Sequence, residues 1–309
     1  MSHISIALAG NPNCGKTTLF NKLTGAHQHV ANWPGVTVER KTGRLLGQRD
    51  VLIQDLPGIY SLSPYSLEEV VSRDYLLNER PDAIINIVDA SNLERNLYLT
   101  TQLREIGIPV VLGLNMIDLV RKNGDRINIT KLSAALGCEV VETSAIKGIG
   151  CKHLGDSAVR LAVGKNTQQV LMPCFSAPVE QALAQIETLL QEKCDPKQIR
   201  WYSIRVFEKD EKAFESLKLN SEQKKKILDI VSAVEDELDD DSESIIANDR
   251  YNYITNLVRE CVEKKKQSAT SLSDRIDSVV TNRWLALPIF ALLMWGVYYL
   301  SIQTIGTVG

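Results

Sequence analysis

Short apolar runs alternate with amphipathic stretches along the first half of the chain. The apolar runs predict buried strands over residues 4–9, 36–46, 51–55, 83–89, 110–115 and 139–143. Helical periodicity lies between them, for example over residues 97–106 and 129–136. Because this alternation is typical of a parallel sheet covered by helices, residues 1–165 are expected to form a doubly wound α/β domain.

The pattern changes after residue 173, where apolar positions recur at helical spacing only. Helices are predicted over residues 179–192, 222–238 and 244–265, and Asn220-Ser221 marks a helix start. Residues 235–243 hold seven acidic residues in nine, which we interpret as a solvated helix end and loop. Residues 170–266 are therefore expected to form a small all-α domain.

The last residues form a third kind of segment. Residues 284–309 contain no Asp, Glu, Lys or Arg, and the Ser- and Thr-rich residues 267–283 before them resemble a linker. An apolar stretch of this length predicts a transmembrane helix, here the start of a truncated membrane domain, although a core helix or hairpin is the alternative. Basic residues upstream, among them Arg275 and Arg283, place residues 1–283 in the cytoplasm by the positive-inside rule.

Composition narrows the function classes only a little. A net charge of −3 gives no electrostatic argument for nucleic acid. The six cysteines show no C-x-x-C pair, which favours a reducing compartment over a disulfide framework. His27 and His29 would suit a metal if they lay on a strand, but solvated loop histidines are the simpler interpretation.

The most informative motif is GNPNCGKT at residues 10–17, which matches the phosphate-binding pattern G-x-x-x-x-G-K-[ST]. It follows a predicted strand and opens a predicted helix, so the loop N–H groups and the helix N-terminus can face the phosphates. Lys16 can reach the β- and γ-phosphates, and the Thr17 hydroxyl can ligate Mg²⁺. The motif predicts a site for a nucleoside triphosphate.

Further motifs occur in the order that GTPases use. Asp55-Leu56-Pro57-Gly58 ends a predicted strand, so Asp55 can hold a Mg²⁺ water and the Gly58 N–H can meet the γ-phosphate. Thr37 stands in a polar loop from which it can ligate Mg²⁺. The residue after Gly58 is Ile59, which cannot orient an attacking water as a glutamine does, so intrinsic hydrolysis is expected to be slow.

Two strand-end motifs point to guanine. Asn115-Met116-Ile117-Asp118 offers a carboxylate that can accept hydrogen bonds from guanine N1–H and the N2 amine, a donor pair that adenine lacks. Thr143-Ser144-Ala145 offers a backbone N–H for guanine O6. Met116 stands where many GTPases have a lysine, which predicts weak binding and fast exchange. Glu68 and Glu69 are interpreted as helix-start caps and not as bases.

These stretches resemble the FeoB family of ferrous-iron transport proteins. The resemblance rests on GNPNCGKT (10–17), NWPGVTVER (32–40), DLPGIYSL (55–62), NIVDASNLERNLYLT (86–100) and NMID (115–118). It covers the whole chain as that family's cytoplasmic part, with a G domain, a helical domain and the first membrane helix. The resemblance implies a GTP-binding and GTP-hydrolysing module of an inner-membrane, multi-pass Fe²⁺ transporter.

The resemblance also implies a K⁺ ion near the phosphates, held by Asn13 with backbone ligands from residues 32–35, so that K⁺ stimulates hydrolysis. A local loop hydrogen bond is the alternative for Asn13. The residues expected to act in hydrolysis are Asn13, Lys16, Gly35 and Thr37. The residues expected to bind GTP or GDP with its Mg²⁺ and K⁺ are Gly10, Asn11, Pro12, Asn13, Cys14, Gly15, Lys16, Thr17, Thr18, Gly35, Val36, Thr37, Asp55, Leu56, Pro57, Gly58, Asn115, Met116, Asp118, Thr143, Ser144 and Ala145.

Other functions stay open at this point. The chain is also compatible with a membrane-anchored regulatory GTPase switch that transports nothing, or with a soluble assembly GTPase whose apolar tail packs as a hairpin. Mn²⁺ is an alternative cargo to Fe²⁺. Expected partners are the guanine nucleotide, Fe²⁺ through the membrane domain, the lipid bilayer, a small cytoplasmic accessory protein and a second copy of the chain.

Overall fold

The computed structural model describes residues 3–25, 28–48, 50–63, 65–164, 174–265 and 286–300. The chain divides into two compact units, residues 1–264 and 265–309, which are described separately. The predicted boundary at residues 165–170 and the predicted linker at residues 267–283 lie outside the described residues.

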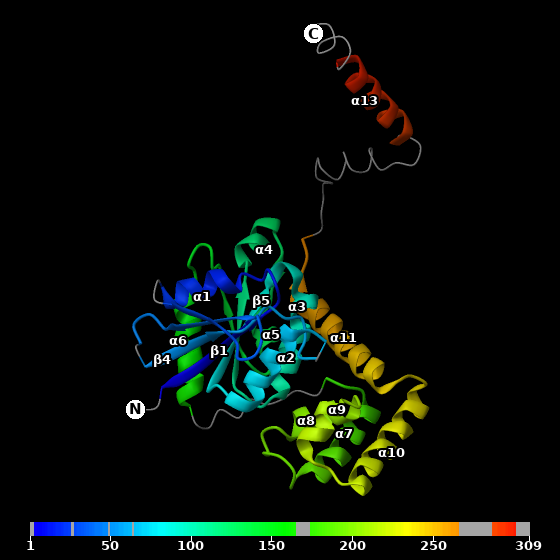
Figure 1. Cartoon of the computed structure of the whole chain (residues 1–309). Helices are drawn as coiled ribbons and strands as arrows, with labels where there is room; N and C mark the ends of the chain where they lie inside the picture. The colour runs from blue at the N-terminus through cyan, green and yellow to red at the C-terminus, as the bar shows by residue number, and fades with distance from the viewer. Residues whose placement is uncertain are drawn as a thin grey trace. The chain divides into compact units, whose positions relative to one another are not determined.

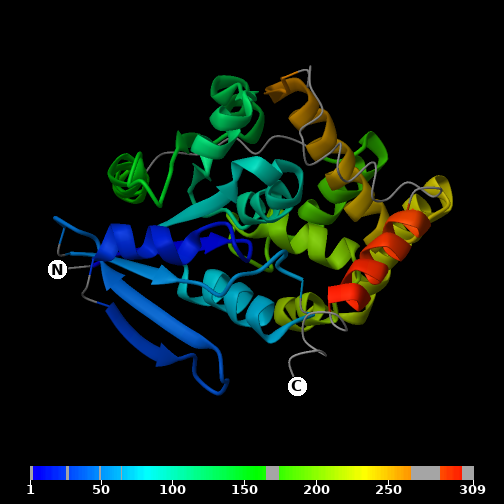
Figure 2. The ribbon, with the colours of Figure 1, turned by 90° about the horizontal axis from the view of Figure 1, so that it is seen from above.

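The centre of the first unit is a seven-stranded sheet with the order β2-β3-β4-β1-β5-β6-β8 (Figure 1). Strands β4, β1, β5, β6 and β8 are parallel, while β2 and β3 are antiparallel to their neighbours at one edge. Figure 2 shows this blue antiparallel ribbon from above. The strands are β1 Ile4–Gly10, β2 Gln28–Asn32, β3 Glu39–Arg44, β4 Val51–Asp55, β5 Ala83–Asp89, β6 Val110–Asn115 and β8 Glu139–Glu142.

The doubly wound sheet is confirmed, but it is mixed and not wholly parallel. The strand predicted over residues 36–46 is shorter, since β3 begins at Glu39 and a turn precedes it. Strand β2 was not predicted at all, because most of its residues are exposed and polar and give no apolar run. His29 lies on β2, and His27 is outside the described residues.

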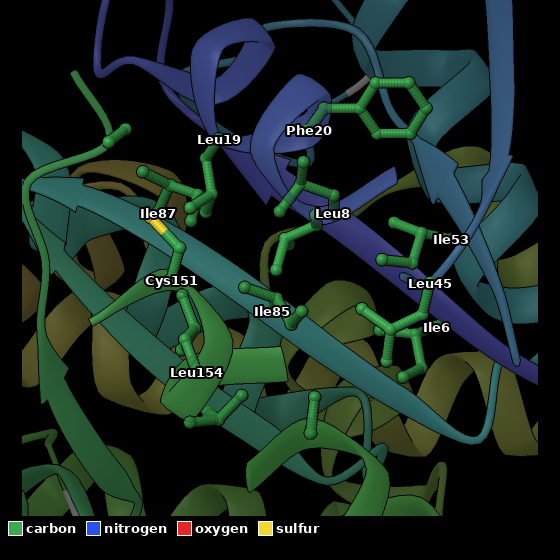
Figure 3. Packing of buried hydrophobic residues seen from close by; sticks show 14 of the residues in the cluster. Ile6, Leu8, Leu19, Phe20, Leu45, Ile53, Ile85, Ile87, Cys151 and Leu154 are labelled. Atoms are coloured by element: carbon green, nitrogen blue, oxygen red, sulfur yellow. The ribbon is translucent and has the colours of Figure 1, made fainter. Parts of the chain in front are cut away.

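Successive residues of the central strands face opposite sides of the sheet, so each strand contributes side chains to two apolar layers. Ile6 and Leu8 join the layer built with α1 (Lys16–Thr24) and α6 (Cys151–Val163), which Figure 3 shows around Phe20 and Leu154. Ala7 and Ala9 join the opposite layer, which α3 (Leu93–Glu105) covers. Because these strand residues are fully buried on both faces, the phosphate loop that follows β1 starts from a rigid base.

The remaining helices of this part surround the second layer and the strand ends. The helix α2 (Leu67–Asp74) continues into a π-helical turn at Tyr75–Glu79, and a short 3-10 turn at Ala90–Asn92 precedes α3. The helices α4 (Ile117–Asn123) and α5 (Ile129–Leu136) follow β6. The helix predicted over residues 129–136 is confirmed, whereas α3 begins at Leu93, before the predicted 97–106.

Residues 174–261 form a helical bundle with its own apolar core. Helices α7 (Ala177–Leu190), α10 (Ser221–Leu238) and α11 (Ser242–Cys261) confirm the three predicted helices within a few residues. Two further helices were missed, α8 (Ile199–Phe207) and α9 (Glu211–Leu217). Residues 203–207 of α8 are all buried and α9 has seven residues, so neither shows an amphipathic stripe.

The last helix of the bundle packs back onto the sheet domain. Ile254 and Leu257 of α11 share a core cluster with residues of α4 and α5. Strand β9 (Val262–Glu263) then pairs antiparallel with β7 (Arg126–Ile127), so the strand pattern does not end at residue 173 as predicted. Residues 1–264 are thus one compact unit in which both parts contact each other directly.

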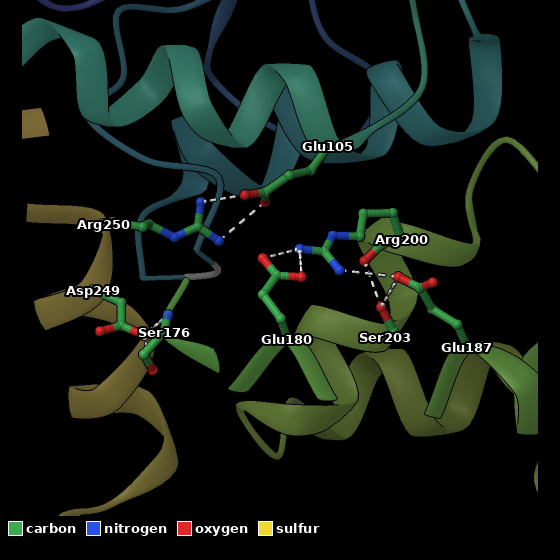
Figure 4. A network of polar contacts seen from close by, with 8 residues as sticks. All are labelled: Glu105, Ser176, Glu180, Glu187, Arg200, Ser203, Asp249 and Arg250. Carbon is green, nitrogen blue, oxygen red and sulfur yellow. Dashed lines mark hydrogen bonds and ion pairs between the residues drawn. The ribbon is translucent and has the colours of Figure 1, made fainter. Parts of the chain in front are cut away.

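A buried ion pair joins the two parts at this contact. Arg250 of α11 donates to both carboxylate oxygens of Glu105 on α3, at 2.6 and 3.0 Å, and both side chains are almost fully buried (Figure 4). Burial lowers the pKa of Arg250, but the carboxylates of Glu105 and Glu208 together outweigh that effect and the net pKa is raised. Such a bidentate pair fixes the orientation of α11 on α3.

The second unit contains α13 (Ala286–Leu300), an apolar helix on which Trp295 and Tyr299 stack with ring centroids 5.6 Å apart. Within the described residues, no helix has both the length and the hydropathy needed to cross a membrane. The predicted span also includes residues 284–285 and 301–309, which lie outside the described residues.

Candidate nucleotide-binding site

The phosphate loop lies between β1 and α1, as the sequence predicts, and two of its glycines are required by close packing. A Cβ at Gly15 would come within 2.3 Å of Asn115 Nδ2, and Gly15 also has a φ of +89°. A Cβ at Gly10 would lie 2.7 Å from the carbonyl oxygen of Ile87. The loop therefore keeps a tight path that a side chain at either position would disrupt.

A buried carboxylate faces the loop lysine. Lys16 Nζ lies 2.6 Å from Asp55 Oδ1 at the end of β4, and Asp55 is only 6% exposed. Burial raises the pKa of the Asp55 carboxyl, while the nearby Lys16 ammonium opposes that rise. Thr17 is exposed beside Lys16 at the start of α1. Hydroxyl and carboxylate oxygens are hard donors of the kind that Mg²⁺ prefers.

Asn13 occupies an exposed, left-handed position in the same loop, with a φ of +65°. In the described part of the chain, its side chain makes no hydrogen bond. Asparagine tolerates this backbone conformation better than most residues because its short polar side chain can hydrogen-bond locally. The amide oxygen is therefore accessible to a ligand near the phosphates.

The segment after Asp55 is docked against the phosphate loop. The Ile59 N–H donates to the Gly10 carbonyl at 3.3 Å, and a Cβ at Gly58 would lie 3.3 Å from Pro12 Cα. The Ile59 side chain is 1% exposed and belongs to the core, so it does not face the loop's solvent side. Farther along, Glu69 forms a capping box with Ser66 at the start of α2, as predicted.

The loop that carries Gly35, Val36 and Thr37 packs through Val36 against the apolar cluster that contains Leu56 and Ile59. No hydrogen bond or ion pair among the described residues joins Thr37 to the phosphate loop or to Asp55. The loop is closed by the Trp33 N–H, which donates to the Val38 carbonyl at 2.9 Å. The Trp33 ring is buried against Tyr75. The Arg40 guanidinium lies over the Trp33 ring, 4.7 Å from the ring centroid.

Asn115 ties the second half of the site to the phosphate loop. Its Nδ2 donates to the Cys14 carbonyl at 2.8 Å, and its Oδ1 accepts from the Ala145 N–H at 2.9 Å. The Thr143 hydroxyl also donates to this Oδ1, at 3.4 Å. One buried side chain thus connects three loops that are far apart in the sequence.

Asp118 lies in the first turn of α4 with its side chain partly exposed. Its Oδ2 lies 3.1 Å from Lys147 Nζ. Hydrogen bonds from Lys147 and then Ser144 hold the pKa of Asp118 below its usual value, so the carboxylate is charged at neutral pH. Lys147 was missed in the sequence, although its place just after Thr143-Ser144-Ala145 was a usable signal.

A strand–loop–helix phosphate site, a buried carboxylate beside its lysine and an Asn-x-x-Asp motif tied to the loop define a P-loop protein of the GTPase class. The comparisons with known proteins agree. Residues 4–158 match the family model "Ferrous iron transport protein B", and residues 175–263 match "FeoB cytosolic helical domain". The chain belongs to the FeoB family of ferrous iron transport proteins.

Individual relatives show how far the likeness extends. The Fe(2+) transport protein A/Fe(2+) transporter FeoB fusion protein of Porphyromonas gingivalis is 41% identical, over 94% of this chain and 36% of the relative. The Fe(2+) transporter FeoB of Shigella flexneri is 38% identical, over 98% of this chain and 39% of the relative. The chain therefore spans less than two fifths of these relatives' length.

Solved structures show the same fold. A GDP-bound mutant of S. thermophilus NFeoB has a TM-score of 0.80 and 48% identity, covering 84% of this chain and all of that chain. The mGMPPNP-bound NFeoB from S. thermophilus has a TM-score of 0.75 and 46% identity, covering 86% of this chain and all of that chain.

Proposed function

We propose that this chain is the GTP-binding and GTP-hydrolysing cytoplasmic module of a membrane transporter for ferrous iron. The observation that carries the nucleotide part is Asn115, which holds the phosphate loop, the Asp118 motif and the Ala145 loop together through three hydrogen bonds. The names of the relatives and the guanine nucleotides in the solved neighbours support both parts of the proposal.

The domain bounds of the proposal are those predicted from the sequence. Residues 1–165 are the G domain, residues 170–266 the helical domain, residues 267–283 the linker and residues 284–309 the first membrane helix. The intact transporter crosses the cell inner membrane several times, with residues 1–283 in the cytoplasm. The fused Fe(2+) transport protein A of the Porphyromonas gingivalis relative supports a small accessory partner, and a second copy of the chain is a further proposed partner.

In the proposed site, each residue has a separate task in GTP binding. The backbone N–H groups of the loop after Pro12 and the Lys16 ammonium bind the phosphates. Asp118 accepts hydrogen bonds from guanine N1–H and the N2 amine, the Ala145 N–H binds O6, and Met116 lies beside the base. Thr17, Thr37 and Asp55 would hold Mg²⁺, which supplies charge neutralisation at the β- and γ-phosphates when bound.

Hydrolysis is proposed to depend on backbone groups and on K⁺. Because Ile59 is buried and apolar, the Gly58 N–H and the loop at Gly35 and Thr37 position the attacking water instead. Asn13, with the backbone at residues 32–35, would hold K⁺, which adds positive charge beside the phosphates. For this step, the loop that carries Thr37 closes on the nucleotide so that the Thr37 hydroxyl can ligate Mg²⁺.

The transport part is tested by iron uptake in cells that express the intact transporter containing this chain. We expect uptake of radioactive Fe²⁺ to fall strongly when Asp118 is replaced by Asn, because that variant binds the cell's guanine nucleotides far more weakly. Asp229→Asn, an exposed position on α10, is the control. Unchanged uptake in Asp118→Asn would contradict a role for guanine-nucleotide binding in transport, whereas wild-type uptake no higher than the background would favour the alternative, a membrane-anchored regulatory switch without transport function. Competition with Mn²⁺ in the same assay tests the cargo.

A further inference from the structure

Arg95, in the first turn of α3, contacts both the phosphate loop and the segment after Asp55. Its carbonyl oxygen accepts from Asn11 Nδ2 at 3.3 Å. Its guanidinium lies over the Tyr60 ring, 4.4 Å from the ring centroid. In the part of the chain that the structure describes, no carboxylate forms an ion pair with this guanidinium. Arg95 lies within the stretch 86–100 that carried the family resemblance, but no role was predicted for it.

Residues 58 and 59 contact the phosphate loop directly, and Tyr60 is connected to it indirectly through Arg95. Gly58 packs on Pro12, and the Ile59 N–H donates to the Gly10 carbonyl. Tyr60 is 42% exposed, and Arg95 is the group that connects its ring to the loop. The Gly58 and Ile59 contacts are made by a glycine and by a backbone N–H. The contact between Tyr60 and Arg95 is the one that two side chains make, so a side-chain substitution can remove it.

We propose that Arg95 is a positioning residue for GTP hydrolysis, which holds Tyr60 and thereby fixes the Gly58 N–H relative to the phosphate loop. The inference rests on the proposed GTPase function. Its physical reason is the absence of a water-orienting side chain directly after Gly58, since Ile59 is apolar and buried. When backbone N–H groups alone position the reacting groups, small displacements of that backbone lower the rate.

The Asn11 contact makes the side chain of Arg95 separately testable. Because Asn11 donates to the backbone carbonyl of Arg95, a substitution of the side chain leaves the contact between α3 and the phosphate loop in place. Arg95→Ala therefore removes only the cation–π contact with Tyr60. Tyr60→Leu removes the same contact from the other side, whereas Tyr60→Phe keeps an aromatic face under the guanidinium.

The test is steady-state GTP hydrolysis and GDP affinity for Arg95→Ala, Arg95→Lys, Tyr60→Leu, Tyr60→Phe and the double variant Arg95→Ala with Tyr60→Leu. We expect kcat to fall roughly two- to fivefold in Arg95→Ala and Tyr60→Leu, as for a partly exposed cation–π contact. GDP affinity stays unchanged, and the double variant falls no further than either single one. Arg95→Lys and Tyr60→Phe recover most of the rate. Arg259→Ala, exposed on α11, is the matched control.

Two results would overturn the proposal. If the effects of the two single substitutions multiply in the double variant, Arg95 and Tyr60 act independently. If Arg95→Ala abolishes hydrolysis while Tyr60→Leu has no effect, the guanidinium acts on the phosphate directly. Wild-type protein that hydrolyses no GTP in any salt would instead refute the proposed GTPase function, which separates the two failures. Circular dichroism of each variant confirms that it is folded.

Discussion

Replacing Asp118 by Asn is expected to change the base preference of the site from guanine to xanthine nucleotides. The introduced amide would present an N–H group toward the guanine donors, so hydrogen bonding is replaced by a donor–donor clash, whereas xanthine offers a carbonyl oxygen at C2. The loss of two hydrogen bonds to a charged acceptor predicts a fall in GDP affinity on the order of a hundredfold. Equilibrium titration with fluorescent GDP and XDP measures both affinities.

Asp118→Asn changes the charge of this side chain with little change in its shape. Asparagine and aspartate side chains have nearly the same shape, so the substitution leaves the packing of α4 unchanged and replaces only the charged acceptor. The carboxylate is held by Lys147 at 3.1 Å, and Lys147→Gln in the same titration shows how much that contact contributes. Asp229→Asn is the control. An Asp118→Asn protein that binds GDP as tightly as the wild type would show that another residue reads the base.

The second large effect is expected for Asn13 and K⁺. We expect GTP hydrolysis to be faster in KCl than in NaCl by at least about tenfold, because a bound cation stabilises charge that develops on the phosphates. Replacing Asn13 should remove this difference while GDP affinity is kept. The measurement is the rate of phosphate release at equal ionic strength in the two salts.

The backbone at Asn13 requires two variants. Asn13 has a φ of +65°, which alanine adopts only with strain. Asn13→Ala therefore loses the amide and adds backbone strain, whereas Asn13→Gly loses the amide without that strain. If both variants lose the response to K⁺, the side chain is the cause. Asn252→Ala, exposed on α11, is the control. Equal rates of the wild type in both salts would contradict the potassium proposal.

The sequence predicted those parts of the fold in which burial leaves a pattern. Strands β5 and β6 were predicted at their observed bounds because both faces of each are covered, which gives continuous apolar runs. Strand β2 was missed because its pairing with β3 depends on backbone hydrogen bonds at an exposed edge. Helix α8 was missed because it is buried on nearly all sides.

For the site, residues within local motifs were predictable and residues that meet only in space were not. The motif at residues 115–118 placed Asn115 among the predicted nucleotide-binding residues, but its bond to the Cys14 carbonyl spans 101 residues and was not predictable. Arg95 and Lys147 contact the site from positions outside the nucleotide motifs. Likewise, the Arg250–Glu105 pair joins residues 145 positions apart, which no periodicity indicates.

We propose that the site around Asn115 and Asp118 selects guanine nucleotides. Titrating the wild-type chain with GTP and with ATP, in KCl with Mg²⁺, tests it most directly. We expect GTP to bind and to be hydrolysed slowly, while ATP shows no saturable binding at the same concentrations, because Asp118 and the Ala145 N–H have no matching groups on adenine. Comparable binding of ATP and GTP would contradict it.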